Sequence, residues 1–468
     1  MASETLNTQI PHTKSPGPRV ATVGAVLLGL LFVVMPLSGG LSPFIFAGMA
    51  VAGLCLVFHP LVPFALYFAA LFFKETPIPG VPVTANQVLA ILFFITWGAT
   101  WLRGRTQKLE SSFLPILGIT ILYFAVSAIS GENLERGFLH FKYVLIYGAM
   151  AACLAASLTT EAAILSLAWI VTLLSFGAAL GGLVEAIQNN VLSAFTGRWT
   201  GSVRIQGTAP NSIVFAWNLL YSFPFAFLLY SELRTGSLRK VALLMGMFAL
   251  FISLLTFNRQ TIVMVFVMLA LSAMVFVYRN RNTLLAIVAA AAVVGGATVA
   301  PLVAKRIFTV TTLERDPSFL ERRDSYILGM EMFSHHPVFG VGFGSFPAVY
   351  RSYLPEDYTT YYAQYHAPNR LKFPDMGYLA LLAETGIVGL GIFLGLMSFL
   401  VRRAWTLRKW ALARGDTFAA NYSSLVLALL VFILMTSGIQ DTFLYVRVWI
   451  VLGLALLLDR RMLETKPA

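Results

Sequence analysis

The sequence predicts an all-α membrane protein of about 12–14 transmembrane helices, with one large periplasmic loop that contains short helices. Of its 468 residues, 58% are hydrophobic and only 12% are charged, against about 45–50% and 25% in soluble domains. Apolar runs repeatedly reach the length of about 20 residues that a bilayer span requires. Spans of this kind are helices, because an open sheet leaves its backbone unpaired in lipid. The composition excludes a soluble enzyme, a disordered protein and a nucleic-acid-binding domain.

The elements follow in order from these apolar runs. The polar residues 1–19 predict a short tail, and the run from Val20 to Leu37 predicts a retained first span, because it lacks a clear small-residue cleavage site. Cys55 and Cys153 lie within apolar runs and are expected to be small buried residues. The runs at 61–73 and 445–459 are short enough to be re-entrant or tilted, which sets the lower limit of the helix count. The remaining runs lie near 41–58, 88–102, 113–129, 140–158, 162–187, 212–231, 241–257, 261–278, 283–304, 377–400 and 418–437.

Charge predicts how these helices are oriented. With the N-terminus in the cytoplasm and 14 spans, the inner segments hold 18 of the 33 basic residues but only 7 of the 21 acidic residues. The outer segments are then almost neutral, so the net charge of +12 follows from the retention of basic residues on the cytoplasmic side. We therefore expect both termini to lie in the cytoplasm.

One outer loop, residues 305–375, is far longer than the other connections. Loops of this length are usually functional or independently folded. The chain therefore divides into an N-terminal tail, a first helical part, this loop, a second helical part and a C-terminal tail. Their bounds are 1–19, 20–304, 305–375, 376–459 and 460–468.

Within the loop, residues 318–334 predict a helix that lies near the surface. Ser318 and Glu321 have the spacing of a capping box. Large apolar residues recur at roughly helical spacing and are expected to form the apolar face. They are Phe319, Tyr326, Ile327, Met330 and Phe333.

Basic residues at the outer face or within spans are the first candidates for chemistry. Arg259 lies between two apolar runs with almost no loop, where a charge usually marks a function; the alternative is a short turn from which Arg259 reaches the headgroups. Lys142 lies near the outer start of a span, where a long basic side chain is expected to extend its charged end to the lipid headgroups. Arg198 and Arg204 flank glycines ahead of a helix start, an arrangement that favours an anionic group. The alternative there is a plain loop capped by Asn211.

The segment from His335 to Gly344 is a second candidate. Gly340, Gly342 and Gly344 alternate as in a phosphate-binding turn, but no Lys-Ser/Thr pair follows, so the segment is not a P-loop. A glycine turn at a helix end is the alternative. Adjacent histidines can ligate a metal, but no matching ligand cluster accompanies His335 and His336, and no metal site is predicted.

A third group combines aromatic rings with possible bases. Asp375 precedes the span at 377–400, where a carboxylate either caps the helix or acts as a general base. His366, nine residues earlier, is a second candidate base. Tyrosines crowd the preceding residues and would suit sugar faces, the alternative being an interfacial aromatic belt. They are Tyr350, Tyr353, Tyr358, Tyr361, Tyr362 and Tyr365.

Together these motifs resemble the O-antigen ligase and Wzy-type polysaccharide polymerase superfamily. That family shows an arginine and a Pro-x-x-Gly-x-Gly run in an outer loop, followed by a His-Asn/Ser/Gln pair, nine residues and GxxG. Here the loop holds Arg323 and the run Pro337-Val338-Phe339-Gly340-Val341-Gly342-Phe343-Gly344. Asp375-Met376, nine residues and Gly386-Ile387-Val388-Gly389 follow. The resemblance covers about residues 190–400.

The resemblance implies a GT-C-type glycosyltransferase of the bacterial inner membrane. Such an enzyme transfers a glycan from undecaprenyl diphosphate to an acceptor hydroxyl on the periplasmic side, without metal, nucleotide sugar or other cofactor. By position in the motif, the diphosphate-binding arginines correspond to Arg204 and Arg259, with Arg198 as the fallback for the first. Arg323, His336 and Lys142 complete the candidate substrate-binding residues.

One departure from the family pattern bears on the function. The family's ligase histidine aligns with Asp375, which can still accept a proton from a hydroxyl. This favours an inverting polymerase of cell-surface or exopolysaccharide repeat units over a lipid A–core ligase. A ligase for that or another acceptor is the first alternative, and a non-enzymatic flippase or exporter, which usually has two similar halves, is the second. Expected partners are the undecaprenyl-diphosphate-linked glycan, an acceptor saccharide or glycolipid, the lipid bilayer and a chain-length regulator; no nucleic acid is expected.

Overall fold

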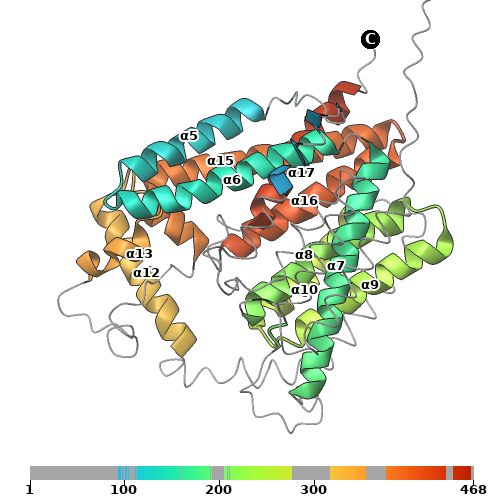
Figure 1. The fold of residues 1–468 in the computed structure, drawn as a ribbon, viewed down its shortest axis with the longest axis horizontal. Coiled ribbons are helices and arrows are strands. Elements are labelled where there is room, and N and C mark those ends of the chain that lie inside the picture. Colours follow the sequence, from blue (N-terminus) through green and yellow to red (C-terminus); the bar gives the residue numbers. More distant parts are fainter. Residues whose placement is uncertain are drawn as a thin grey trace, which may run out of the picture.

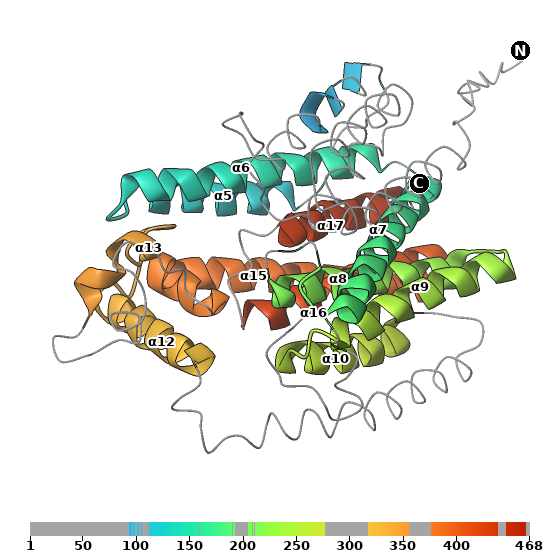
Figure 2. The ribbon, with the colours of Figure 1, turned by 60° about the horizontal axis from the view of Figure 1, so that its bottom comes forward.

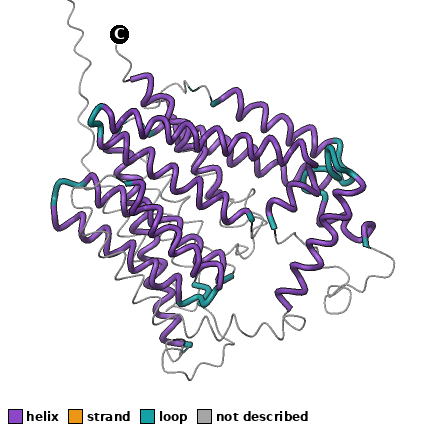
Figure 3. Tube along the Cα trace, turned by 180° about the vertical axis from the view of Figure 1, so that it is seen from behind, coloured by secondary structure: helices purple, strands orange, loops and turns teal. Residues whose placement is uncertain are grey.

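The computed structural model is helical throughout the part of the chain that it describes. That part comprises residues 111–191, 205–276, 317–354, 376–438 and 446–464, except 112, 159, 190, 208 and 210, together with a few positions between 93 and 104. Six helices within it are long and apolar enough to cross a membrane, and no strand occurs there (Figure 3). The predicted class, an all-α polytopic membrane protein, is confirmed. The candidate spans at 20–38, 41–58, 61–73 and 283–304, and most of 88–102, lie outside the described residues.

The long helices follow the predicted spans closely. Some begin earlier than the apolar run, because a polar side chain ahead of the run caps the helix. Asn133 Oδ1 accepts from Arg136 N at 2.9 Å, so the helix predicted from residue 140 begins at Leu134. The six are α6 (Leu134–Ser157), α7 (Glu161–Gln188), α8 (Ser212–Glu232), α9 (Gly236–Leu254), α15 (Gly377–Ala413) and α16 (Thr417–Ser437). Three further helices contain shorter apolar stretches: α5 (Leu114–Ile129), α10 (Arg259–Val275) and α17 (Val446–Glu464).

The helices form two groups that share α16. Helices α5, α6, α15 and α17 pack together, and α7, α8, α9 and α10 form the other group (Figures 1 and 2). Helix α16 contacts α15 and α17 from the first group and α8 and α10 from the second. Among the membrane-spanning candidates, α8 and α16 are the most completely buried. Both are apolar around their whole circumference, as a helix surrounded by other helices should be.

Helix ends that the charge pattern assigns to the inner side lie together. Asn421 Nδ2 donates to Glu232 Oε1, which joins the start of α16 to the end of α8. Arg408 Nε donates to Val275 O at 2.9 Å and to Ser424 Oγ at 3.2 Å, which joins α15, α10 and α16. The chain therefore alternates between two ends as expected, and the cytoplasmic location of this end stays a prediction.

The predicted helix of the long loop is present, and not all of the large apolar residues that predict it face the protein interior. Helix α12 runs Pro317–His335, so Ser318 lies in its first turn. Leu328 and Met332 are fully buried, whereas Phe319 and Tyr326 are 40% and 52% exposed. The reason is a small residue. A Cβ at Gly329 would lie 2.7 Å from Leu379 Cγ, so α12 packs on α15 through the side of the helix that carries its glycine.

Labelling of single cysteines tests the orientation. Val338 is 48% exposed at the end we assign to the periplasm, and Leu412 is 41% exposed at the opposite end. With Cys55 and Cys153 replaced by alanine, we expect an impermeant maleimide to label Val338→Cys in intact spheroplasts and Leu412→Cys only after permeabilisation. The reverse pattern would invert the predicted topology.

Candidate active site

Helix α15 is broken at Gly386, and the segment that follows α12 fills the break. Gly386 has φ +64° and ψ −168°, outside the helical region and readily reached only by glycine. Beyond the break, Ile387 N donates to Pro337 O at 3.0 Å and Val388 N donates to Val338 O at 3.3 Å. A Cβ at Gly386 would lie 2.2 Å from Val338 O, so the close approach of the two chains requires glycine.

The same segment also binds the part of α15 that precedes the break. Val341 N donates to Ala383 O at 3.0 Å, and Gly342 N donates to Glu384 O at 2.8 Å. Backbone groups that the interrupted helix leaves without a helical partner are thus paired from outside the helix. The short first part of α15, residues 377–385, is held at its end by this docked segment, which we define as residues 337–346.

The buried carboxylate of Glu384 completes the docking. Its Oε2 accepts from Gly344 N at 2.9 Å and its Oε1 accepts from Phe346 N at 3.1 Å. Glu384 is only 8% exposed, and an ionised carboxylate is an acceptor only, so these N–H groups suit it. They lie at the start of the short helix α13 (Phe346–Val349), where the backbone N–H groups have no helical acceptor.

The glycines of the docked segment do not form a phosphate cradle, because their N–H groups already have acceptors. Besides the bonds above, Gly340 N donates to His336 O at 3.0 Å and Phe343 N donates to Ser127 Oγ at 3.1 Å. The alternative of a glycine turn at a helix end is correct, but the glycines also allow close approach. At Gly342, where φ is +105°, a Cβ would lie 2.1 Å from Gly131 Cα.

The turn between α5 and α6 contacts the docked segment as well. Glu132 N donates to Val341 O at 2.9 Å. Tyr123 OH on α5 donates to Thr385 O at 2.7 Å, directly before the break in α15. Four elements far apart in sequence therefore meet at one end of the bundle: the α5–α6 turn, the end of α12, α13 and the start of α15.

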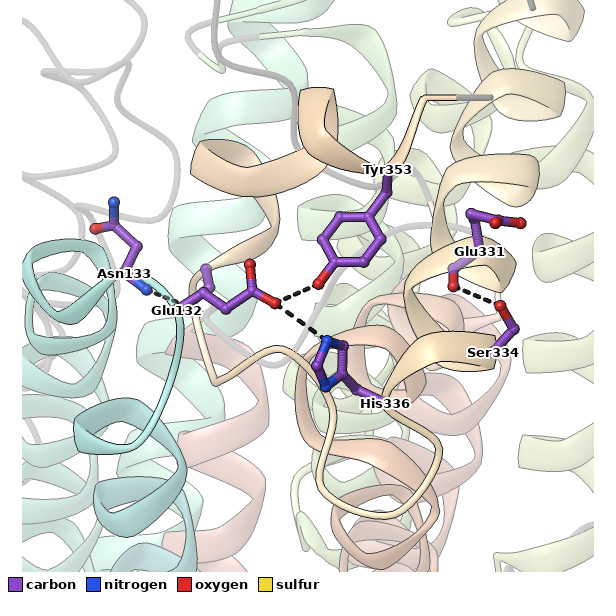
Figure 4. A network of polar contacts seen from close by, with 7 residues as sticks. Glu132, Asn133, Glu331, Ser334, His336 and Tyr353 are labelled. Atoms are coloured by element: carbon purple, nitrogen blue, oxygen red, sulfur yellow. Dashed lines mark hydrogen bonds and ion pairs between the residues drawn. The ribbon is translucent and has the colours of Figure 1, made fainter. Parts of the chain in front are cut away.

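A polar network lies beside this junction (Figure 4). Glu132 Oε1 lies 3.3 Å from His336 Nε2 and accepts a hydrogen bond from Tyr353 OH. The neighbouring His335 Nε2 lies 3.3 Å from Glu331 Oε1. Both histidine rings pack edge-on against the Tyr353 ring, with centroids 5.7 and 6.1 Å away. Within the described residues, no group of His, Cys, Asp and Glu has the arrangement of a metal site.

The protonation of Tyr353 is fixed by this network. Burial raises the pKa of the Tyr353 phenol, and the hydrogen bond to the Glu132 carboxylate and its negative charge raise it further. Tyr353 therefore stays a neutral hydrogen-bond donor at physiological pH. The candidate His336 directly precedes the docked segment, and its Nε2 lies 3.3 Å from Glu132 Oε1. This contact links the start of the docked segment to the α5–α6 turn.

Two other candidate residues contact their neighbours in the chain. Arg323 is exposed on α12, and its Nη2 lies 3.6 Å from Asp324 Oδ1. Lys142 lies two turns inside α6, rather than at its start, and its Nζ lies 5.1 Å from the centre of the Tyr143 ring.

The segment expected to bind a donor lipid is anchored where it enters α8. Gly207 N donates to Glu185 Oε2 at 2.6 Å, and Gln206 N contacts both oxygens of that carboxylate at 3.2 Å. Asn211 caps α8, with its Oδ1 accepting from Val214 N at 2.8 Å, which is the cap that the alternative interpretation of this segment predicts. Arg204 precedes this anchor by two residues.

The other candidates fall outside what the structure describes. Arg198, Arg204, His366 and Asp375 lie outside the described residues, and of Arg259 only the backbone is described. Arg259 is the first residue of α10, directly after the cap Asn258, whose Oδ1 accepts from Gln260 N at 3.1 Å. Met376, next to Asp375, is the residue before the first turn of α15.

One buried cation escaped the sequence analysis. Arg447 is 3% exposed near the start of α17, with its guanidinium carbon 5.5 Å from the centre of the Trp217 ring. The signal was available, because a charged residue within an apolar run usually marks a function, the same argument that selected Arg259. The length of the run at 445–459 alone predicts a short span and gives Arg447 no role.

Substitution of Glu384 tests the docking. Glu384→Gln keeps one acceptor oxygen but turns an NH2 group toward one of the two backbone N–H groups. We expect it to lower the free energy of unfolding by about 1–3 kcal/mol, the cost of an unpaired buried polar group. Thermal unfolding in detergent measures this, and limited proteolysis should cut the outer loop faster. Glu331→Gln on exposed α12 surface is the matched control, and an equal effect in both variants would contradict the assigned role of Glu384.

Comparison with known families fits this geometry. Residues 242–394 match the family model described as O-Antigen ligase. The matched segment begins in α9 and ends in α15 beyond Gly386, so it includes the start of α10 and the whole docked segment. The match supports the superfamily that the motifs resemble and, at the level of that family, glycan transfer of the ligase or polymerase type. No curated protein matches the chain.

Proposed function

We propose that this membrane protein of the O-antigen ligase family polymerises polysaccharide repeat units. It would transfer a glycan from an undecaprenyl diphosphate carrier to an acceptor sugar hydroxyl on the periplasmic side of the bacterial inner membrane. The observation that carries the proposal is the match over residues 242–394, which runs from the helix pair around Arg259 to the break in α15.

The proposed reaction is an inverting displacement. Asp375 would take the proton of the acceptor hydroxyl, while the oxygen of that hydroxyl attacks the anomeric carbon of the donor sugar. The bond from that carbon to the phosphate oxygen breaks, and the diphosphate leaves with its negative charge stabilised by Arg204 and Arg259. Preorganised charge of this kind is commonly the largest contribution to such catalysis.

The docked segment holds the first part of α15, the helix that follows the proposed base in the sequence. Asp375 comes directly before Met376 and the first part of α15. That part ends at Gly386, where four backbone hydrogen bonds and the Glu384 carboxylate join α15 to the docked segment. Catalytic groups need rigid support to within a fraction of an ångström. A short helix fixed at its far end and packed on α12 provides such support for its first residues.

A ligase is the second candidate, because the matched family model is described as O-antigen ligase. Polymerase and ligase would use the same donor site, so only the acceptor separates them. Purified protein supplied with lipid-linked repeat units alone should give a ladder of longer glycans if it is a polymerase. A single shift that requires lipid A–core would indicate a ligase, and transport without any new glycosidic bond would indicate an exporter.

Alanine substitution tests the donor arginines. Arg204→Ala and Arg259→Ala should each reduce the transfer rate by roughly 30-fold to several thousand-fold, because losing one partner of a buried charge contact costs about 2–5 kcal/mol. Transfer is measured as polymer formed from purified lipid-linked repeat units. Arg234→Ala, on exposed surface at the opposite end, should keep its rate. Near-normal polymer from Arg259→Ala would remove that residue from the donor site.

Substitution of Asp375 separates a base from a helix cap. Asp375→Asn keeps shape and capping ability but cannot accept a proton, so activity should collapse while thermal stability in detergent stays nearly unchanged. Asp375→His, which introduces the family's ligase residue, should retain partial activity. Full activity in Asp375→Asn would end this assignment, and His366→Ala would then test the other candidate base.

A further inference from the structure

One side of α15 is exposed from the break at Gly386 to near the end of the helix. No residue of the first part, 377–385, is exposed. Beyond the break, exposed residues recur every three or four positions and therefore share one face of the helix, which we call the exposed stripe. The stripe consists of Ile387, Gly391, Leu394, Gly395, Ser398, Arg402, Trp405, Thr406 and Lys409.

The exposed stripe changes from apolar to cationic over a distance that matches a bilayer. At 1.5 Å of rise per residue, Arg402 lies about 22 Å along the helix from Ile387, and Lys409 lies about 33 Å from it. The hydrocarbon core of a bilayer is about 30 Å thick. Arg402, Trp405 and Lys409 therefore fall where hydrocarbon gives way to phospholipid headgroups.

The positive charge at this end of the stripe has no acidic counterpart on α15. Among the described residues, no carboxylate forms an ion pair with Arg402, Arg408 or Lys409. Two acidic residues at the same end of the bundle serve the fold instead. Asp416 caps α16 by accepting from Ala419 N at 2.9 Å, and Glu232 accepts from Asn421, as described above.

Trp405 combines an apolar ring with neighbouring cations at this boundary. Its ring is 42% exposed. The Arg408 guanidinium carbon and Lys409 Nζ lie 5.5 and 5.6 Å from the ring centre. Tryptophan is enriched at the level of the headgroups, and basic side chains near a span end extend their charge to the same level. An apolar stripe that ends in these groups suits a ligand with apolar chains and an anionic head.

We propose that Arg402, Trp405 and Lys409 bind the headgroup of an anionic phospholipid, whose acyl chains lie along the apolar part of the exposed stripe. The leaflet is the one at this end of the bundle, which the charge pattern predicts to be cytoplasmic. This inference goes beyond the proposed function and does not depend on it. A second copy of the chain is a poorer occupant, because parallel copies in one membrane would bring their cationic ends together.

Binding is measured on delipidated protein in neutral detergent. Phosphatidylglycerol is titrated in, and the thermal midpoint gives the apparent Kd. The double variant Arg402→Gln, Lys409→Gln should weaken this binding by roughly 30-fold, about fivefold for each charge. Its thermal midpoint before lipid is added should stay close to that of the wild type, because both side chains are exposed and glutamine is a good helix former. Wild-type affinity in this variant would overturn the proposal.

Two measurements on the unchanged protein test the same point. Phosphatidylcholine, which has no net charge, should bind much more weakly than phosphatidylglycerol, and equal affinity for both would contradict recognition of an anionic headgroup. Added sodium chloride should weaken the binding of phosphatidylglycerol, because the cations are exposed and salt screens them. Affinity that does not change with salt would contradict the role of these charges.

A charge-matched control lies at the same end of the bundle. Arg234 and Lys240 are exposed between α8 and α9 and at the start of α9. The double variant Arg234→Gln, Lys240→Gln should bind phosphatidylglycerol nearly as the wild type does. An equal loss in both double variants would reduce the effect to net charge and overturn the proposal. Trp405→Leu, which keeps apolar bulk but loses the aromatic face, should weaken binding several-fold.

The position of the stripe is tested by a probe at Thr406. A fluorophore on Thr406→Cys, with Cys55 and Cys153 replaced by alanine, is placed in nanodiscs of phosphatidylglycerol and phosphatidylcholine. A nitroxide on the lipid headgroup should quench it strongly. Weak quenching would mean that another part of the chain covers the stripe, and a disulfide between two Thr406→Cys copies would identify a second copy as the occupant. Either result would overturn the proposal.

Discussion

The structure at the end of the bundle where α15 begins depends on the hydrogen bonds between one segment and the break in α15. A helix interrupted at Gly386 leaves backbone N–H and C=O groups without helical partners, and such groups are costly to bury away from water. The docked segment supplies hydrogen-bond partners for the backbone on both sides of the break. In turn, the Glu384 carboxylate accepts hydrogen bonds from backbone N–H groups of that segment. Each part satisfies groups that the other leaves open, so neither arrangement is stable alone.

This pairing explains why glycines recur in the motif. They resemble an anion-binding turn, yet their N–H groups are already bonded within the protein, and their lack of a side chain lets two backbones approach closely. The motif is therefore a joint between the long loop and the second helical part. The contact between the His336 ring and the Glu132 carboxylate connects the α5–α6 turn to the same joint. Loops carry function when a scaffold fixes their position, and this joint fixes the loop at the first part of α15.

The sequence predicted the class, the described spans and the helix of the long loop, because each depends on local apolar length and spacing. It did not predict the break, because the residues on both sides of Glu384-Thr385-Gly386 are apolar enough for 377–400 to be predicted as one span. Apolar spacing also does not show which side of α12 packs on α15, because the contact with Leu379 depends on the small size of Gly329. Which candidate side chains converge depends on tertiary pairing, which local patterns do not contain. His336 shows this, because its partner Glu132 lies about two hundred residues away.

Buried charges in the described residues are stabilised in different ways, and the difference bears on function. Glu384 is held by backbone N–H groups of its own chain, so its charge serves the fold. Arg447 lies against the face of the Trp217 ring, and its backbone oxygen accepts from Tyr221 OH on α8. Glu384 thus fixes the first part of α15 on the docked segment, whereas Arg447 fixes the start of α17 on α8. Helix starts that are held in this way give rigid support to any functional group near them, which is what a catalytic site requires.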